Sequence, residues 1–275
     1  MREYKKIFIV GSGRSGTHWL NKILKSHRHV VSNDYESSIF KVILGSFTKA
    51  RLPWNKSWKT VWKNFENSHL NEWVSEKRLK KLIRNEKKHN SKNLIKAKNI
   101  VKIILDEYFE KHAEGSNCVL VEKTPGHIYY IREILDLFPE ALIVEIIRDG
   151  RDVCKSLDQL ANSGVSWAPN KLNEQMKLWK NALKPVRDLR KNPLYSSKIL
   201  TVKFEALLNE KLNTLEGIFK FCGLEFDNEL AFLIEEDSLT ATKNPFQSWD
   251  EYFDETSKIK MTENLDSDLK QLGYL

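Results

Sequence analysis

The stretch that decides the fold is KKIFIVGSGRSGTHWL, residues 5–20. Residues 5–10 end in a run of four apolar residues, three of them β-branched, which favours a short buried strand. Gly11 and Gly16 then have the G-x-x-x-x-G spacing of a loop that binds phosphate through backbone N–H groups. From Thr17 onward the apolar residues recur at helical intervals. The stretch therefore predicts a strand, a glycine-rich loop and a helix in succession.

Strand-like runs recur along the chain, at residues 30–32, 118–121, 141–147 and 199–203, and helical patterns separate them. This alternation predicts an α/β fold in which helices cover both faces of a P-loop-like parallel sheet. We expect one domain over residues 1–275, with a helical, Lys-rich insertion at about 54–112. Ligands of such sheets bind at the carboxyl ends of the strands. The loops after Val10, Val121 and Ile147 should therefore share one crevice.

Composition narrows the class of protein. Three cysteines that lie far apart among 275 residues favour neither a disulfide framework nor a zinc site. No run approaches the roughly 20 apolar residues that cross a bilayer, so we expect a cytoplasmic protein with reduced thiols. The formal charge is +8, and Lys77–Lys102 alone holds eleven basic residues against Glu86, a net charge of +10. This basic block predicts either a solvated helix face or an anionic partner, including a membrane surface.

The loop lacks what a nucleotide triphosphatase needs. Such an enzyme has Lys after the second glycine and then Ser or Thr as a Mg²⁺ ligand, whereas this chain has Thr17 and His18. The cation lies inside the loop instead, as Arg14, whose planar guanidinium can hold two oxygens of an anion. A P-loop kinase or nucleotide hydrolase remains an alternative function, and a polyanion-binding protein that uses the basic block is another.

Two motifs resemble the sulfotransferases that use 3′-phosphoadenosine 5′-phosphosulfate (PAPS). Residues 14–19, RSGTHW, are similar to the loop that holds the 5′-phosphosulfate. Arg148 with Ser156 eight residues later is similar to the signature that holds the 3′-phosphate, and two helical turns after Asp149 return Ser156 to the crevice side. Residues 122–125 (EKTP), 203–208 (KFEALL) and 219–226 (FKFCGLEF) extend the resemblance over most of the chain outside the insertion.

The resemblance implies a set of nucleotide contacts and a product, 3′-phosphoadenosine 5′-phosphate (PAP). Trp19 is at the position that stacks on adenine, Phe204 is where a Tyr is common, and Lys243 lies in a late loop that would close over the nucleotide. The implied contacts are Arg14, Ser15, Gly16, Thr17, His18, Trp19, Arg148, Ser156, Phe204 and Lys243.

Sulfuryl transfer needs cations at the reacting group and a base at the acceptor, and we expect no metal. Arg14 and Lys123 are the candidate cations. Pro125 stands where the phenol-sulfating branch of the family has its His, and Glu36 matches the base of the glycan and tyrosylprotein branch, which the chain therefore resembles more closely. Asp34 and His127 are alternative bases.

The sequence leaves the acceptor open between glycan, lipid, peptide and small metabolite. Trp54, Trp58 and Trp62 fall on one face of a predicted helix, where they form either a buried stripe or a wall for a sugar ring or apolar acceptor. We expect acceptor specificity to lie in the insertion. We predict no specific nucleic-acid binding and make no prediction of oligomeric state.

Overall fold

The structure is a computed structural model that describes residues 4–48, 58–89, 91–113, 115, 118–235 and 248–275. Its centre is a parallel sheet of five strands in the order β2-β3-β1-β4-β5. The strands are β1 (Lys6–Gly11), β2 (Val30–Ser32), β3 (Val119–Lys123), β4 (Leu142–Ile147) and β5 (Ile199–Lys203). The predicted parallel α/β fold is confirmed. Because β1 lies between β3 and β4, the carboxyl ends of these three strands are adjacent, as the expected crevice requires.

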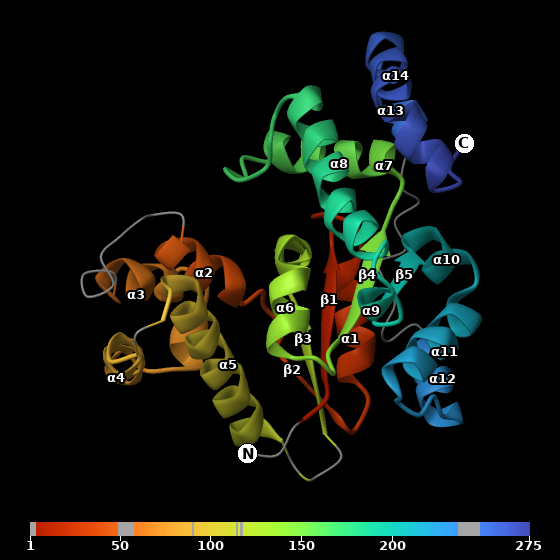
Figure 1. The fold of residues 1–275 in the computed structure, drawn as a ribbon. Coiled ribbons are helices and arrows are strands. Elements are labelled where there is room, and N and C mark those ends of the chain that lie inside the picture. The colour runs from red at the N-terminus through yellow and green to blue at the C-terminus, as the bar shows by residue number, and fades with distance from the viewer. Residues whose placement is uncertain (1–3, 49–57, 90, 114, 116–117, 236–247) are drawn as a thin grey trace.

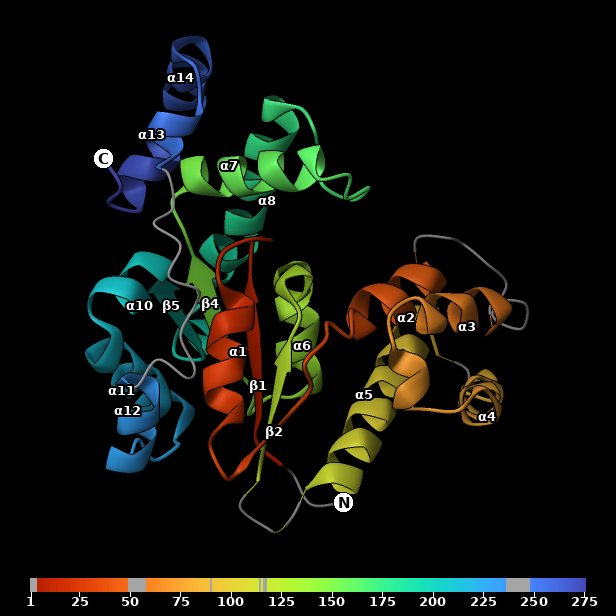
Figure 2. The same ribbon diagram turned by 180° about the vertical axis from the view of Figure 1, so that it is seen from behind.

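Strand β1 is buried along its length and apolar from Ile7 to Val10, because both of its faces are covered. Phe8 and Val10 belong to one hydrophobic cluster, and Ile7 and Ile9 to a second cluster on the opposite face. The second face carries α1 (Thr17–Lys25), α10 (Phe204–Asn209), α11 (Lys211–Cys222) and α12 (Asn228–Glu235), seen from behind in Figure 2. The first face carries η2 (Pro125–Tyr130), α6 (Ile131–Leu137), α8 (Leu172–Leu189) and α9 (Pro193–Ser196), as Figure 1 shows.

A group of helices flanks the sheet on the side of β2 and β3 (Figure 1). It consists of α2 (Ile39–Thr48), α3 (Trp58–Glu66), η1 (Leu70–Glu72), α4 (Glu76–Lys87) and α5 (Asn93–His112). These helices begin at Ile39, before the predicted start of the insertion near residue 54. Their buried side chains form one cluster with Phe8 and Val10, so the group shares a core with the sheet.

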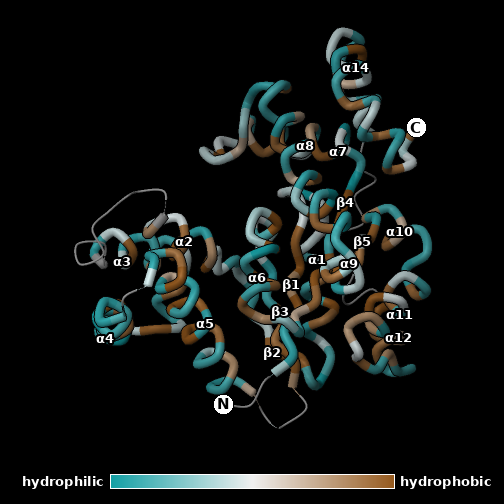
Figure 3. Tube along the Cα trace, viewed as in Figure 1, coloured by the Kyte–Doolittle hydropathy of each residue, from teal (hydrophilic) through white to brown (hydrophobic). Residues whose placement is uncertain are grey.

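The basic block lies on α4 and the first half of α5, and α4 consists mainly of hydrophilic residues (Figure 3). Leu79, Leu82, Ile83 and Ile100 are buried as their spacing predicts. The apolar pattern of the block also predicts burial of Leu94 and Ile95, and this prediction is wrong, since their exposed fractions are 39% and 49%. Both residues lie in the first turn of α5, before Ala97, where the row of buried side chains on this helix begins. Ile95 also lies on a different face of the helix from that row.

A third cluster closes the carboxyl end of the sheet. It joins α7 (Gly150–Asn162) and α8 to α13 (Trp249–Tyr252) and α14 (Glu255–Gln271). Met261, Leu265 and Leu269 bury one face of α14 at four-residue intervals, a signal that could have predicted this helix. Among the described helices none is both long and apolar enough to span a membrane. The cysteines Cys118, Cys154 and Cys222 are buried and free, and burial raises the pKa of Cys154 and that of Cys222 to about 12.

Candidate active site

The glycine-rich loop between β1 and α1 forms one wall of the site. Gly16 begins α1 with a φ of 97°, in the left-handed region that favours glycine, and no side chain caps the helix there. Arg14 also has a positive φ, 72°, an uncommon conformation for a residue with a side chain. The Ser15 hydroxyl donates a hydrogen bond of 2.8 Å to the Ser12 carbonyl oxygen and so closes the loop. The first N–H groups of α1 are thus directed at the loop, a geometry that favours an anion.

The loop meets the strand-end motif on β4 and α7 directly. Arg14 Nε donates a hydrogen bond of 3.0 Å to Ser156 Oγ, although the residues are 142 positions apart. Arg148 Nη1 donates to the Arg14 carbonyl oxygen at 3.3 Å. The resemblance implied different phosphates for Arg14 and Ser156, but the structure joins the two side chains to each other. Two guanidinium groups and one helix N-terminus therefore lie together.

Arg148 is held from several sides and is only 8% exposed. Its guanidinium lies 4.9 Å from the centre of the Phe204 ring, and its carbonyl oxygen accepts a hydrogen bond of 3.0 Å from Trp179 Nε1. The Phe204 ring in turn packs on Gly16 so closely that a Cβ there would overlap it. Phe204 thus supports both the loop and Arg148.

A third polar pair lies at the end of β3. Lys123 Nζ is 3.4 Å from Glu36 Oε1, in the segment that follows β2. The Lys123 side chain is almost fully buried, whereas about half of the Glu36 side chain is exposed. The structure therefore brings the predicted cation and the predicted base together and leaves the carboxylate accessible.

The two alternative bases have other partners. Asp34 forms an exposed ion pair of 2.6 Å with Lys25, and the hydrogen bond from Lys25 lowers the pKa of Asp34. His127 is fully buried, with its Nδ1 2.7 Å from Glu122 Oε2. Burial alone would raise the pKa of Glu122, but His127 together with the hydroxyls of Ser37 and Thr124 holds that pKa below its usual value. Asp34 and Glu36 are both accessible carboxylates, and Glu36 is the one that contacts Lys123.

Comparison with known proteins decides the family. The profile of the sulfotransferase family matches residues 6–228, which include every described residue of the loop, the strand-end motif and the Lys123–Glu36 pair. The chain belongs to the sulfotransferase family. The predicted family and the prediction of an enzyme of this class are confirmed.

Solved structures agree with this sulfotransferase in fold. The sulfotransferase domain of the Synechococcus PCC 7002 olefin synthase superposes with a TM-score of 0.55 at 17% identity, covering 96% of this chain and 95% of that one. The sulfotransferase domain of the curacin biosynthetic pathway gives 0.57 at 13% identity, covering 100% and 99%. Mouse sulfotransferase SULT7A1, solved with PAP, gives 0.51 at 12% identity, covering 98% and 84%. No curated protein sequence matches the chain.

The remaining predicted contacts of this sulfotransferase lie along α1. Thr17 is buried and His18 is exposed. Trp19 is 7% exposed and packs in the cluster on the α1 face of the sheet, where its indole N–H has no hydrogen-bond partner among the described residues. Lys243 and Trp54 lie outside the described residues. Within the described ranges, no group of three or more His, Cys, Asp or Glu residues could hold a metal ion.

Residues that the sequence analysis did not single out support this arrangement. Glu205 accepts a hydrogen bond of 2.9 Å from the Asp149 N–H at the start of α7 and one of 2.8 Å from the Tyr274 hydroxyl. Burial, reinforced by the Glu205 carboxylate, raises the pKa of Tyr274. Trp179 packs on Gly150, where a Cβ would lie 2.7 Å from the indole ring. The sequence holds a signal for Glu205, which follows Phe204 in the strand-end match, but none for Trp179 or Tyr274.

Proposed function

We propose that this sulfotransferase moves the sulfuryl group of PAPS to a hydroxyl or amine of its acceptor and releases PAP. The observation that carries the proposal is the Arg14–Ser156 contact, together with the hydrogen bond from Arg148 to Arg14. It brings the two motifs implied for the two anionic ends of PAPS into one crevice. An ordinary nucleotide such as ADP has no 3′-phosphate for the second motif to bind.

In the proposed complex each phosphate takes one part of the site. The loop N–H groups and Arg14 hold the 5′-phosphosulfate, and Arg148 with Ser156 holds the 3′-phosphate. Arg14 exchanges its hydrogen bond to Ser156 for the 5′-phosphosulfate, so the hydroxyl becomes available to the 3′-phosphate. Trp19 and Phe204 border the nucleoside.

The reaction is an in-line displacement at sulfur. The acceptor oxygen or nitrogen forms a bond to sulfur while the bond between sulfur and the 5′-phosphate oxygen breaks, and its electron pair leaves with PAP. Arg14 and Lys123 stabilise the charge that develops on the bridging and sulfuryl oxygens. Glu36 takes the acceptor proton, for which its exposure and its 3.4 Å contact with Lys123 suit it. This assignment is closer to the glycan and tyrosylprotein branch than to the phenol branch.

Nucleotide binding without metal tests the proposal. We expect PAP in the presence of a chelator to raise the unfolding temperature more than ADP does at the same concentration. A ligand at 100 times its dissociation constant adds about 2.7 kcal/mol to the stability of the folded state. Equal shifts with the two nucleotides, or no shift with either, would contradict the proposal.

A further inference from the structure

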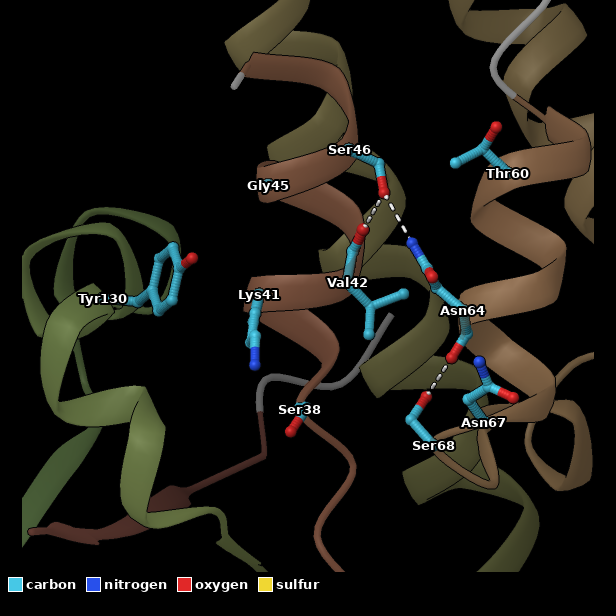
Figure 4. A pocket seen from close by; sticks show the side chains of 10 residues that line it. All are labelled: Ser38, Lys41, Val42, Gly45, Ser46, Thr60, Asn64, Asn67, Ser68 and Tyr130. Atoms are coloured by element: carbon cyan, nitrogen blue, oxygen red, sulfur yellow. Dashed lines mark hydrogen bonds between the residues drawn. The ribbon is translucent and has the colours of Figure 1, made fainter. Parts of the chain in front are cut away.

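A pocket of about 510 Å³ is lined by residues of α2, of α3 and the turn after it, and by Tyr130 of η2 (Figure 4). Four Ser and Thr hydroxyls, two Asn amides, the Tyr130 phenol and Lys41 line it, together with Val42 and Gly45. No carboxylate is among these ten described residues. The lining therefore offers many hydrogen-bond donors and acceptors and a single formal charge, which is positive.

One end of the pocket is connected to the chain segments that carry the candidate catalytic pair. The Ser38 N–H donates a hydrogen bond of 3.2 Å to Thr124 Oγ1, and Thr124 directly follows Lys123. Ser38 itself comes two residues after Glu36 and lines the pocket. Ser38 thus links one end of the pocket to the segments that hold the proposed base and the proposed cation.

Hydrogen bonds orient three of the polar side chains of the pocket, Ser46, Asn64 and Ser68. Ser46 Oγ donates to the Val42 carbonyl oxygen and accepts a hydrogen bond of 3.3 Å from Asn64 Nδ2 (Figure 4). Ser68 Oγ donates to the Asn64 carbonyl oxygen at 2.8 Å. A ligand that binds here must match both donors and acceptors, as the hydroxyl groups of a sugar do.

A second cavity near the site has the opposite chemistry. It measures about 220 Å³, and its walls include the carboxylates of Asp34 and Glu72 and the rings of Tyr35, Trp73 and Tyr108. The Trp73 and Tyr108 rings are stacked, with centroids 4.0 Å apart. Aromatic rings beside carboxylates suit a flat or cationic ligand. The two cavities therefore predict different acceptors. Preferred transfer to a flat or cationic acceptor would indicate the smaller cavity.

We propose that the acceptor is a saccharide or similar polyol bound between α2 and α3, and that Lys41 favours an acidic member of this class. The inference rests on the proposed function, since it places the accepting hydroxyl next to Glu36. The larger volume and the absence of carboxylates among its described lining residues favour this pocket over the smaller cavity.

Transfer from ³⁵S-labelled PAPS to four probes tests the acceptor class with the full chain. The probes are a glucuronate-containing disaccharide, lactose, 4-nitrophenol and tyramine. We expect kcat/KM to be highest for the acidic disaccharide, lower for lactose and lowest for the other two. Higher kcat/KM for 4-nitrophenol or tyramine than for both sugars would overturn the inference, as would an absence of transfer to either sugar. Stabilisation by PAP is measured in the same samples: its loss contradicts the proposed function, whereas stabilisation without sugar transfer contradicts the acceptor class alone.

Gly45 allows the pocket itself to be tested. A Cβ at this helical position meets no atom of the described residues within 4 Å, so a side chain has room there. We expect Gly45→Trp to raise the KM for the sugars roughly tenfold or more and to leave the shift with PAP unchanged, since one large group removes several contacts. Gly45→Ala is the matched control, and Gly45→Leu is a second, smaller blocking variant in case the tryptophan prevents folding. Lys41→Gln should raise the KM of the acidic disaccharide and leave that of lactose unchanged. A sugar KM unaffected by both blocking variants would refute the pocket.

Discussion

Glu145 is a buried carboxylate in β4, away from the proposed reaction. Its burial predicts how the free energy of unfolding depends on pH. It is 4% exposed, and the Thr201 hydroxyl donates a hydrogen bond to it. Arg190 donates in turn to the same hydroxyl. Burial raises the pKa of Glu145 from 4.5 to about 7, although the Thr201 hydrogen bond and the charge of Arg190 oppose the shift. Loss of water around the carboxylate therefore outweighs its polar contacts.

The direction of the effect on stability follows from which state holds the proton. Between pH 4.5 and about 7 the folded chain binds more protons at Glu145 than the unfolded chain does. The free energy of unfolding therefore falls as the pH rises through this window and levels off above it. At 1.36 kcal/mol per pKa unit, the total loss is about 3 kcal/mol.

Glu145→Gln removes this titration and nearly preserves the shape of the side chain. Urea unfolding measures the free energy of unfolding of the variant and of the wild type. The value for the variant minus that for the wild type should increase by about 3 kcal/mol from pH 5 to pH 8. Glu140→Gln is the control, because Glu140 is an exposed carboxylate in the turn before β4 and should leave the pH dependence of the wild type unchanged. A difference between Glu145→Gln and wild type that stays constant over this range would refute the reasoning.

Three further predictions concern the site. Arg148→Ala should weaken PAP binding roughly 10- to 100-fold and leave ADP binding unchanged, because charged hydrogen bonds contribute about 1.5–3 kcal/mol each. Calorimetric titration measures the affinity for both nucleotides. A retained preference for PAP would contradict the assignment of Arg148 to the 3′-phosphate. Glu36→Gln should lower turnover with labelled PAPS by about 10² while keeping PAP affinity; unchanged turnover would remove Glu36 as the base. Gly16→Ala should lower the free energy of unfolding by about 1–2 kcal/mol because of the φ of 97°, and further because the added Cβ overlaps Phe204. Gly13→Ala, where a Cβ meets no atom within 4 Å, is its control, and equal unfolding midpoints for the two variants would count against this account.

Local patterns in the sequence predicted the elements around the sheet closely. The strands predicted at 30–32 and 199–203 have the bounds that the structure gives to β2 and β5, and the one predicted at 141–147 differs from β4 by one residue. In each case the apolar period and the flanking residues come from neighbours along the chain. The same holds for the strand, loop and helix that begin the chain.

Contacts between distant segments were beyond the reach of the sequence. Nothing local to Trp179 indicates that its indole N–H binds the Arg148 carbonyl oxygen, and nothing local to Tyr274 indicates Glu205. The Arg14–Ser156 hydrogen bond was likewise not predicted, because motif spacing assigns residues to a crevice but does not orient their side chains. Such details depend on how α8 and α14 pack over the carboxyl end of the sheet.

The two arginines of the site differ in how they are held, and this difference bears on their proposed roles. Arg148 is 8% exposed and lies against the Phe204 ring, while its carbonyl oxygen is bonded to Trp179. The side chain of Arg14 is exposed and bonded to Ser156. A guanidinium fixed before binding loses little entropy when it meets a phosphate, so it suits the part of the nucleotide that is the same before and after the reaction. An exposed guanidinium that can exchange partners suits the end of the nucleotide from which the sulfuryl group departs.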